Sequence, residues 1–232
     1  MISDVKKEIK KLANPVQAKL LLKFFKTAVG EYGEGDIFLG IKVPEERKVA
    51  KRFWKEINLE ETQELLKSKI HEERFISLLI LIEKYREGNE REREKIFSTY
   101  INSTKWINNW DLVDVTCPKI VGDYLLDKKR DVLYEFARSE NLWKKRISII
   151  STFAFIKKGE FEDTINIAKI LLKDKHDLIH KAVGWALREV GKKKEKLLID
   201  FLEKHYKEMP RTMVRYSIEK LDEKRRKDYL KR

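Results

Sequence analysis

The sequence of 232 residues has little of the residues that staple or turn a chain: one cysteine, four prolines and nine glycines. A single thiol excludes an internal disulfide and a zinc site built from several cysteines. Because glycine and proline make the turns of sandwiches and barrels, their scarcity favours a helical chain. No apolar run approaches the roughly 18 residues of a membrane span, and the N-terminal segment is unlike a signal peptide. We therefore expect an all-α protein of the cytoplasm.

Charged residues, in contrast, are plentiful and unevenly spread. Lysine and arginine number 52 against 39 aspartates and glutamates, a net charge of +13. Residues 1–100 carry 21 basic and 18 acidic side chains, whereas residues 101–232 carry 31 and 21. A surplus of this size in one part of a chain favours a polyanionic partner, most simply nucleic acid, over a basic surface without a partner.

Apolar residues recur at the spacing of helices along most of the chain. We expect core-facing stripes at positions that include Val5, Ile9 and Leu12; Leu20, Leu21, Phe24, Phe25 and Ala28; and Phe75, Leu78, Leu79 and Ile82. Helix ends are predicted at Asn14-Pro15, Val43-Pro44, Gly88-Asn89, Asn108-Asn109, Ser139 to Asn141, Lys158-Gly159, Gly191 and Met209-Pro210. The helices between these ends leave no room for strands.

Helices in consecutive pairs without a strict sequence repeat are typical of HEAT-like pairs stacked in a helical-repeat solenoid, an ARM/HEAT-type superhelix. We therefore expect residues 1–232 to form a single domain with a concave, basic face. Residues 30–40 depart from the helical pattern, because they hold four of the nine glycines. We predict a loop there, whose glycines serve turn geometry rather than the close approach of a ligand.

The segment 109–114, NWDLVD, predicts the start of a helix, with asparagine as its cap and Asp111 in the first turn. Trp110 and Asp114 are four residues apart, so an indole ring and a carboxylate share one face of that helix. Taken alone, a tryptophan at a helix start is more often part of the core, and an aspartate is more often a solvated surface group.

Two further tryptophans precede a basic residue by three positions: Trp143 with Arg146, and Trp185 with Arg188. Each pair by itself is typical of packing, because arginine stems often cover aromatic rings. Three pairs of an aromatic ring and a charge in the basic part of a solenoid favour a shared groove instead, because a concave face repeats the same register from one helix pair to the next.

Other residue patterns are weaker evidence for a function. His176 and His180 have the spacing of metal ligands on a helix, but no HExxH glutamate or third ligand accompanies them. Cys117 lies in a mostly apolar segment before a proline, which favours a buried thiol over a nucleophile. The sequence contains no GxGxxG, GxxxxGK[ST] or GxSxG motif. We expect neither a metal nor a cofactor.

Four segments, read in order, resemble the AlkD-type DNA alkylation repair family of HEAT-like DNA glycosylases. They are FLGI at 38–41 with Pro44 and Arg47, NWDLVD at 109–114, WKKR at 143–146 and KAVGWALRE at 181–189. The resemblance covers nearly the whole chain. It implies hydrolysis of the N-glycosidic bond of purines alkylated at N3 or N7, such as 3-methyladenine and 7-methylguanine, in duplex DNA during base-excision repair.

The resemblance also implies roles for individual residues. Asp114 matches the family's catalytic aspartate, and Trp110 and Trp185 match its two cleft tryptophans. A cationic purine departs as a neutral base and needs no general acid, so one carboxylate suffices to stabilise the positive charge that develops on the sugar. The faces of the tryptophans attract a cation and thereby favour alkylated over neutral purines.

The implied DNA contacts are Arg146, near the lesion, Arg188 and Arg47 at phosphates, and Tyr32 as the aromatic residue that precedes FLGI. The expected partner is duplex DNA containing alkylated purines, with no membrane partner. We expect a monomer that associates with the nucleoid when bound to DNA. The alternative is a non-catalytic helical-repeat scaffold for DNA or protein, with packed tryptophans and a paired aspartate.

Overall fold

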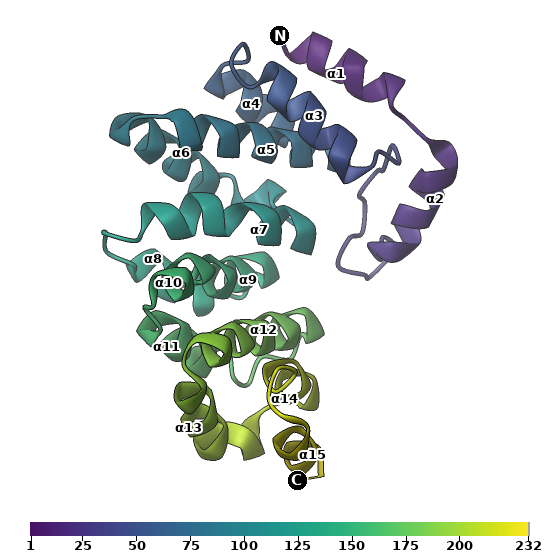
Figure 1. Ribbon diagram of the computed structural model, residues 1–232. Helices are drawn as coiled ribbons and strands as arrows, with labels where there is room; N and C mark the ends of the chain where they lie inside the picture. Colours follow the sequence, from purple (N-terminus) through teal and green to yellow (C-terminus); the bar gives the residue numbers. More distant parts are fainter. Residues whose placement is uncertain (232) are drawn as a thin grey trace. The chain divides into compact units, whose positions relative to one another are not determined.

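The computed structural model describes residues 1–231, and its regular elements are helices (Figure 1). No strand forms within this range, where one isolated bridge pairs Ile37 with Ile70. None of the described helices combines the length and the apolar composition needed to cross a membrane. The all-α prediction is confirmed.

The chain divides into two compact units, the first from Met1 to Thr116 and the second from Cys117 to the C-terminus. The expectation of one domain with a concave basic face stays a prediction. The first unit, called here the N-terminal unit, contains α1 (Ile2–Lys11), α2 (Pro15–Phe24), α3 (Val43–Phe53), α4 (Leu59–Leu66), α5 (His71–Glu87), α6 (Glu90–Asn102), η1 (Thr104–Trp106) and α7 (Trp110–Cys117), whose last residue opens the second unit.

Helix α5 is the centre of the N-terminal unit. It packs against α3, α4 and α6, and every side chain from His71 to Leu81 is buried. A helix that is buried all round needs no polar face, which explains its long apolar run. The charged residues of its first turn, among them Glu72 and Arg74, are therefore inside the protein, where they require partners.

The second unit, called here the C-terminal unit, is built around α12. Its elements are the π-helical turn η2 (Pro118–Gly122), α8 (Asp131–Ala137), α9 (Leu142–Ser151), α10 (Phe153–Lys158), α11 (Glu162–Ile170), α12 (Asp177–Lys193), α13 (Glu195–His205), η3 (Tyr206–Glu208), α14 (Arg211–Ser217) and α15 (Glu223–Lys231). Helix α12 contacts α9, α10, α11, α13 and α14, and α8 packs on α9.

Asparagine side chains cap several of the predicted helix starts. Asn14 accepts from the backbone N–H groups of residues 16 and 17 at the start of α2, and Asn141 does the same for residues 143 and 144 in α9. Asn89 forms a reciprocal capping box with Glu92 in α6. These side chains satisfy backbone donors that the helix itself leaves unpaired.

The predicted helix end at Gly191 is wrong, because α12 continues to Lys193. A Cβ atom at Gly191 would lie 2.4 Å from Cδ2 of Leu198 on α13. The glycine therefore permits close packing of α12 on α13, at the cost of about 1 kcal/mol in helix propensity.

The predicted burial of the apolar face of α2 is also wrong. Leu20 is 58% exposed and Phe24 is 62% exposed, and α2 has no buried residue. Phe25, just past the helix, is buried, whereas Ala28 is exposed. Helical spacing shows that one face is apolar but does not show what covers it.

Candidate functional site

The first turn of α7 carries the predicted aromatic and acidic residues. The side chain of Asn109 accepts from the Trp110 N–H at 2.8 Å, and its backbone C=O accepts from the Val113 N–H. Asp111 lies in the first turn, as predicted, and accepts from the Leu112 N–H at 2.8 Å. A carboxylate at this position complements the positive end of the helix dipole.

The ring of Trp110 is backed by other aromatic rings. It stacks on Phe25, with centroids 5.3 Å apart and planes 20° apart, and meets Phe24 edge to face at 5.9 Å. Trp110 and Asp114 are both half-buried, and their spacing puts them on one face of α7. The start of α7 thus carries an indole ring, packed on Phe25, and a carboxylate one turn further along the same helix face.

The glycine-rich segment is a loop, as predicted, between α2 and α3. Gly30, Gly35 and Gly40 have φ values of 80° to 84°, which favours the turn interpretation of these glycines. The carboxylate of Glu72 accepts from the backbone N–H groups of residues 39–41 at 2.7–3.3 Å, so α5 holds the end of the loop. Tyr32 is half-buried in this loop.

A buried charged cluster lies behind the site, and the sequence analysis missed it. The imidazole of His71 contacts Asp36 through Nδ1 at 3.1 Å and Asp111 through Nε2 at 2.8 Å. Arg74 donates to the other oxygen of Asp36 at 2.7 Å. The available signal was the run HEER directly before an apolar stretch, because such a helix has no exposed face for those charges.

The cluster shifts the ionisation of its members. Burial alone would lower the pKa of His71, but the charge of Asp111 and hydrogen bonds to Asp111 and Asp36 raise it to about 9. Although burial raises the pKa of Asp36, hydrogen bonds and charge from His71 and Arg74 hold it below its usual value. Burial and the neighbouring Glu72 raise the pKa of Glu46, on α3, to about 9. Glu46 is therefore uncharged at neutral pH.

Arg47 is exposed on α3, whereas Arg146, on α9, is only 5% exposed. The Arg146 guanidinium donates to the backbone C=O of Leu178 in the first turn of α12, at 2.5 Å. Its neighbour Trp143 is buried as well. The Trp143 and Arg146 side chains thus contribute to packing inside the C-terminal unit, and a phosphate contact by Arg146 stays a prediction.

On α12, Trp185 is half-buried and meets Phe153 edge to face, with ring centroids 4.7 Å apart. Arg188 forms an ion pair with Glu219 on the segment after α14, and a longer one of 3.4 Å with Glu189. A phosphate contact by Arg188 would compete with these carboxylates, and its role also stays a prediction.

The two spaced histidines have structural partners. His176 caps α12 by accepting from the Leu178 N–H, and His180 bonds through Nε2 to the backbone C=O of Asp174 at 2.6 Å. Within the described part of the chain, no three or more histidine, cysteine or acidic side chains gather as a metal site. Cys117 is buried, as predicted.

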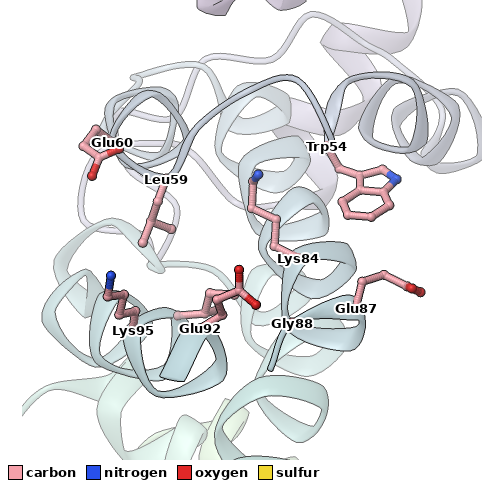
Figure 2. A pocket seen from close by; sticks show the side chains of 9 residues that line it. Trp54, Leu59, Glu60, Lys84, Glu87, Gly88, Glu92 and Lys95 are labelled. Atoms are coloured by element: carbon pink, nitrogen blue, oxygen red, sulfur yellow. The ribbon is translucent and has the colours of Figure 1, made fainter. Parts of the chain in front are cut away.

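A cavity of about 330 Å³ lies in the N-terminal unit, between the end of α3, the start of α4, the end of α5 and α6 (Figure 2). Its lining consists of Trp54, Leu59, Glu60, Lys84, Glu87, Gly88, Glu92, Lys95 and Ile96. None of the site residues predicted from the sequence lines it. Burial lowers the pKa of Lys84, although the charge of Glu92 opposes this shift.

Solved structures share the fold. A predicted DNA alkylation repair enzyme from Enterococcus faecalis matches with a TM-score of 0.72 and 17% identity, over 91% of this chain and 97% of its own. AlkD2 from Streptococcus mutans matches with a TM-score of 0.55 and 17% identity, over 88% and 97%. The protein smu.31 from Streptococcus mutans UA159 matches with a TM-score of 0.54 and 18% identity, over 78% and 93%. The chain therefore has a helical-repeat fold.

The family follows from the sequence itself. The family described as DNA alkylation repair enzyme matches residues 5–221, nearly the whole chain, and the chain belongs to this family. The resemblance that the four segments indicated is confirmed. No curated protein matches the chain.

Proposed function

We propose that the protein is a monofunctional DNA glycosylase that releases cationic N3- or N7-alkylated purines, such as 3-methyladenine and 7-methylguanine, from duplex DNA. Membership of the DNA alkylation repair enzyme family supports a role in alkylation repair. The observation that carries the glycosylase assignment is the pair on α7: the Trp110 ring, backed by Phe25, and the Asp114 carboxylate on the same helix face.

The chemistry requires little from the protein. Alkylation at N3 or N7 gives the purine a positive charge, so the C–N bond breaks to release a neutral base without a general acid. Positive charge then develops on the deoxyribose, and water adds to C1′ of the sugar while its proton passes to solvent. An anionic group fixed beside the sugar stabilises this oxocarbenium-like transition state more than the ground state, which is the requirement for catalysis. Asp114 fills this role and orients the attacking water.

The aromatic face supplies selectivity. A cation over an indole ring gains about 0.5 to 2 kcal/mol, depending on how far it is desolvated. Phe25 stacks on one face of Trp110, and we assign the opposite face to the charged base. Neutral purines lack this attraction and are also poorer leaving groups. We assign the same attraction to Trp185, whose ring Phe153 supports by an edge contact.

Duplex DNA is the proposed partner, held mainly through its phosphates, because the chain carries a net charge of +13. Arg47, Arg146 and Arg188 are the proposed backbone contacts, and Tyr32 is a proposed contact to the lesion. Of the three arginines, Arg47 is the one that is exposed. The protein would act as a monomer on the nucleoid.

The test is the release of 7-methylguanine from a duplex under single-turnover conditions, measured by chromatography of the freed base. Asp114→Asn removes the negative charge at nearly constant shape. We expect the rate constant to fall about 10²- to 10³-fold, the loss of about 3 to 4 kcal/mol that is typical of a group acting in the transition state.

Asp127→Asn is the matched control, because Asp127 is an exposed aspartate in the C-terminal unit, outside the proposed site. It should release base at the wild-type rate. Equal rates for Asp114→Asn and wild type would remove Asp114 from the mechanism. Salt-sensitive duplex binding without release of any alkylated base would instead identify the non-catalytic scaffold.

A further inference from the structure

Three segments that are distant in the sequence meet at one buried histidine. His71 is the first residue of α5, Asp36 belongs to the glycine-rich loop, and Asp111 lies in the first turn of α7. The His71 side chain is 3% exposed, and its two ring nitrogens lie 3.1 Å and 2.8 Å from carboxylate oxygens of Asp36 and Asp111. The imidazole therefore joins the loop to the first turn of α7, where the Asn109 side-chain amide also donates to Asp36 at a longer 3.5 Å.

The geometry defines the charge state of the ring. An ionised carboxylate only accepts hydrogen bonds, and a neutral imidazole has a single N–H. Between two ionised carboxylates, both contacts are hydrogen bonds only if both ring nitrogens carry a proton. Arg74 donates to Asp36 at 2.7 Å and keeps that carboxylate ionised. His71 is thus an imidazolium cation enclosed by protein.

The groups that face this cation come from each neighbouring segment. The loop supplies Asp36, α7 supplies Asp111, α3 supplies Glu46, and α5 itself supplies Glu72 and Arg74. The Glu72 carboxylate accepts hydrogen bonds from three backbone N–H groups. Glu46 has a pKa of about 9, so it carries no charge at neutral pH. The two aspartates are therefore balanced by the imidazolium and the Arg74 guanidinium.

The cation also connects to Trp110 through rings. The imidazole stacks on Phe38 with centroids 4.5 Å apart and lies against Phe25 at 5.0 Å. Phe25 in turn stacks on Trp110. His71 thus reaches Trp110 in two ways, through the adjacent residue Asp111 on α7 and through the Phe25 ring.

We propose that His71 is a positioning residue for the candidate site: as an imidazolium held between Asp36 and Asp111, it fixes the first turn of α7 and thereby the Trp110 ring and the Asp114 carboxylate. This inference rests on the proposed glycosylase function for its effect on rate. It assigns His71 no contact with DNA, water or the reacting atoms.

Loss of the imidazolium should loosen α7 without removing a DNA contact. In His71→Gln, the two aspartates lose the cation between them and repel each other. We expect base release under single-turnover conditions to slow about 10- to 100-fold, the scale of a small misplacement of catalytic groups. The Kd for duplex DNA should change less than about twofold, because affinity depends mainly on phosphate contacts.

The pH profile separates positioning from a general loss of structure. Wild-type release, corrected for release from enzyme-free duplex at each pH, should decline as the pH rises through about 9, the pKa of His71. In His71→Gln the same profile should be flat in that range. Asp111→Asn removes one carboxylate from the ring and should move the decline to lower pH. A wild-type profile without this decline would overturn the proposal.

His205→Gln is the matched control. His205 lies at the end of α13, where its ring contacts Phe201 with centroids 4.7 Å apart, in the C-terminal unit and outside the cluster. The same substitution there should leave the rate and the pH profile unchanged. A slowing equal to that of His71→Gln would overturn the proposal.

Two measurements decide the proposal without any activity. In ¹⁵N-histidine NMR spectra of the full chain, with the His71 signals assigned through His71→Gln, both ring nitrogens should be protonated at pH 7 and titrate near pH 9. A neutral His71 ring at pH 7 would overturn the proposal. If wild type releases no base from alkylated DNA, the proposed function fails, and this spectrum still tests the imidazolium.

The second measurement is amide hydrogen exchange over residues 110–116, corrected for intrinsic rates. His71→Gln should raise exchange there at least tenfold while helices of the C-terminal unit keep their protection. Unchanged exchange would refute positioning. If His71→Gln does not fold, the test uses the fluorescence of Trp110 in the wild type. Subtracting the emission spectrum of Trp110→Phe from that of the wild type gives the Trp110 emission, which should shift between pH 8 and pH 10. No shift would likewise refute it.

Discussion

Buried ionisable side chains give the N-terminal unit a definite response to pH. The pKa values of Glu46 and His71 in the folded protein, both about 9, lie above the ordinary values of 4.5 and 6.5. Their contributions to stability are complete below those ordinary values and decline as the pH rises toward 9. Asp36 acts in the opposite direction, because its pKa is lowered and its contribution is lost as the pH falls.

Glu46→Gln should stabilise the protein at alkaline pH. The folded protein holds the Glu46 carboxyl protonated, whereas the unfolded chain ionises it, and each unit of pKa difference corresponds to about 1.4 kcal/mol. Glutamine resembles the protonated carboxyl and removes this penalty. We expect the free energy of unfolding, measured in urea, to rise by about 2 to 4 kcal/mol at pH 8 and by little at pH 4.5.

Glu45→Gln provides the comparison, because Glu45 is the preceding residue and forms a surface ion pair with Lys48 at 2.7 Å. Such pairs contribute little, so the free energy of unfolding should change by less than about 0.5 kcal/mol at either pH. If Glu46→Gln is no more stabilising at pH 8 than at pH 4.5, the Glu46 carboxyl is ionised in the folded protein.

At the scale of elements, the position of α2 depends on one glycine. Gly40 has a φ of 83°, and a Cβ atom there would lie 2.2 Å from the Asn14 C=O oxygen and 2.5 Å from the Ala18 nitrogen. The Asn14 N–H also donates to the Leu39 C=O at 2.8 Å. The end of the glycine-rich loop therefore lies directly against the first turn of α2.

Gly40→Ala should displace α2 and, with it, the Phe25 ring from Trp110. Strain at a positive φ and the overlap with Asn14 together should lower the free energy of unfolding by about 2 to 4 kcal/mol. Urea unfolding measures this loss, and tryptophan emission of the folded variant reports the changed surroundings of Trp110.

Gly35→Ala tests the strain without the overlap. Gly35 has a φ of 84°, but no heavy atom lies within 4 Å of the position of its Cβ. We expect a loss of only about 1 kcal/mol and unchanged tryptophan emission. Equal losses for the two variants would show that the contact with α2 contributes nothing.

The elements that the sequence predicted well are those with local signals. Asn14, Asn89 and Asn141 cap helices through hydrogen bonds to residues two or three positions away, which a sequence displays directly. The burial of Leu20 and Phe24 was predicted wrongly, because an amphipathic pattern is the same whether or not another element covers it.

The site was predictable in part, because the spacing of residues along one helix is visible in the sequence. Trp110 and Asp114 share a face because of their spacing on one helix, but the partners of Asp111 lie in other segments. His71 is 40 residues from Asp111 and 35 from Asp36. No local pattern encodes such contacts, so a cluster that links three segments emerges only from the fold.

At the scale of the whole molecule, most of the net positive charge belongs to the C-terminal unit. Residues 1–116 carry 22 basic and 20 acidic side chains, whereas residues 117–232 carry 30 and 19. A solvated helical surface needs no such excess, so we assign the C-terminal unit most of the phosphate contacts.

Binding of duplex DNA should therefore depend steeply on salt. With about five phosphates neutralised, affinity should fall about 10²- to 10³-fold between 50 and 200 mM salt, because each contact releases about one counterion. Fluorescence anisotropy of a labelled duplex measures Kd across this range. A Kd that does not change with salt would contradict a phosphate-dominated interface.

Matched double variants locate the contacts. Lys144, on the first turn of α9, and the exposed Lys175 belong to the C-terminal unit, whereas the exposed Lys10 and Lys51 belong to the N-terminal unit. Replacing both lysines of the first pair with glutamine should reduce the slope of log Kd against log salt by about one to two, and the second pair should leave it unchanged. Both variants lose the same net charge, so a difference between their salt slopes shows which unit binds the phosphates. Equal slopes would show that net charge alone, and not its position, determines the binding.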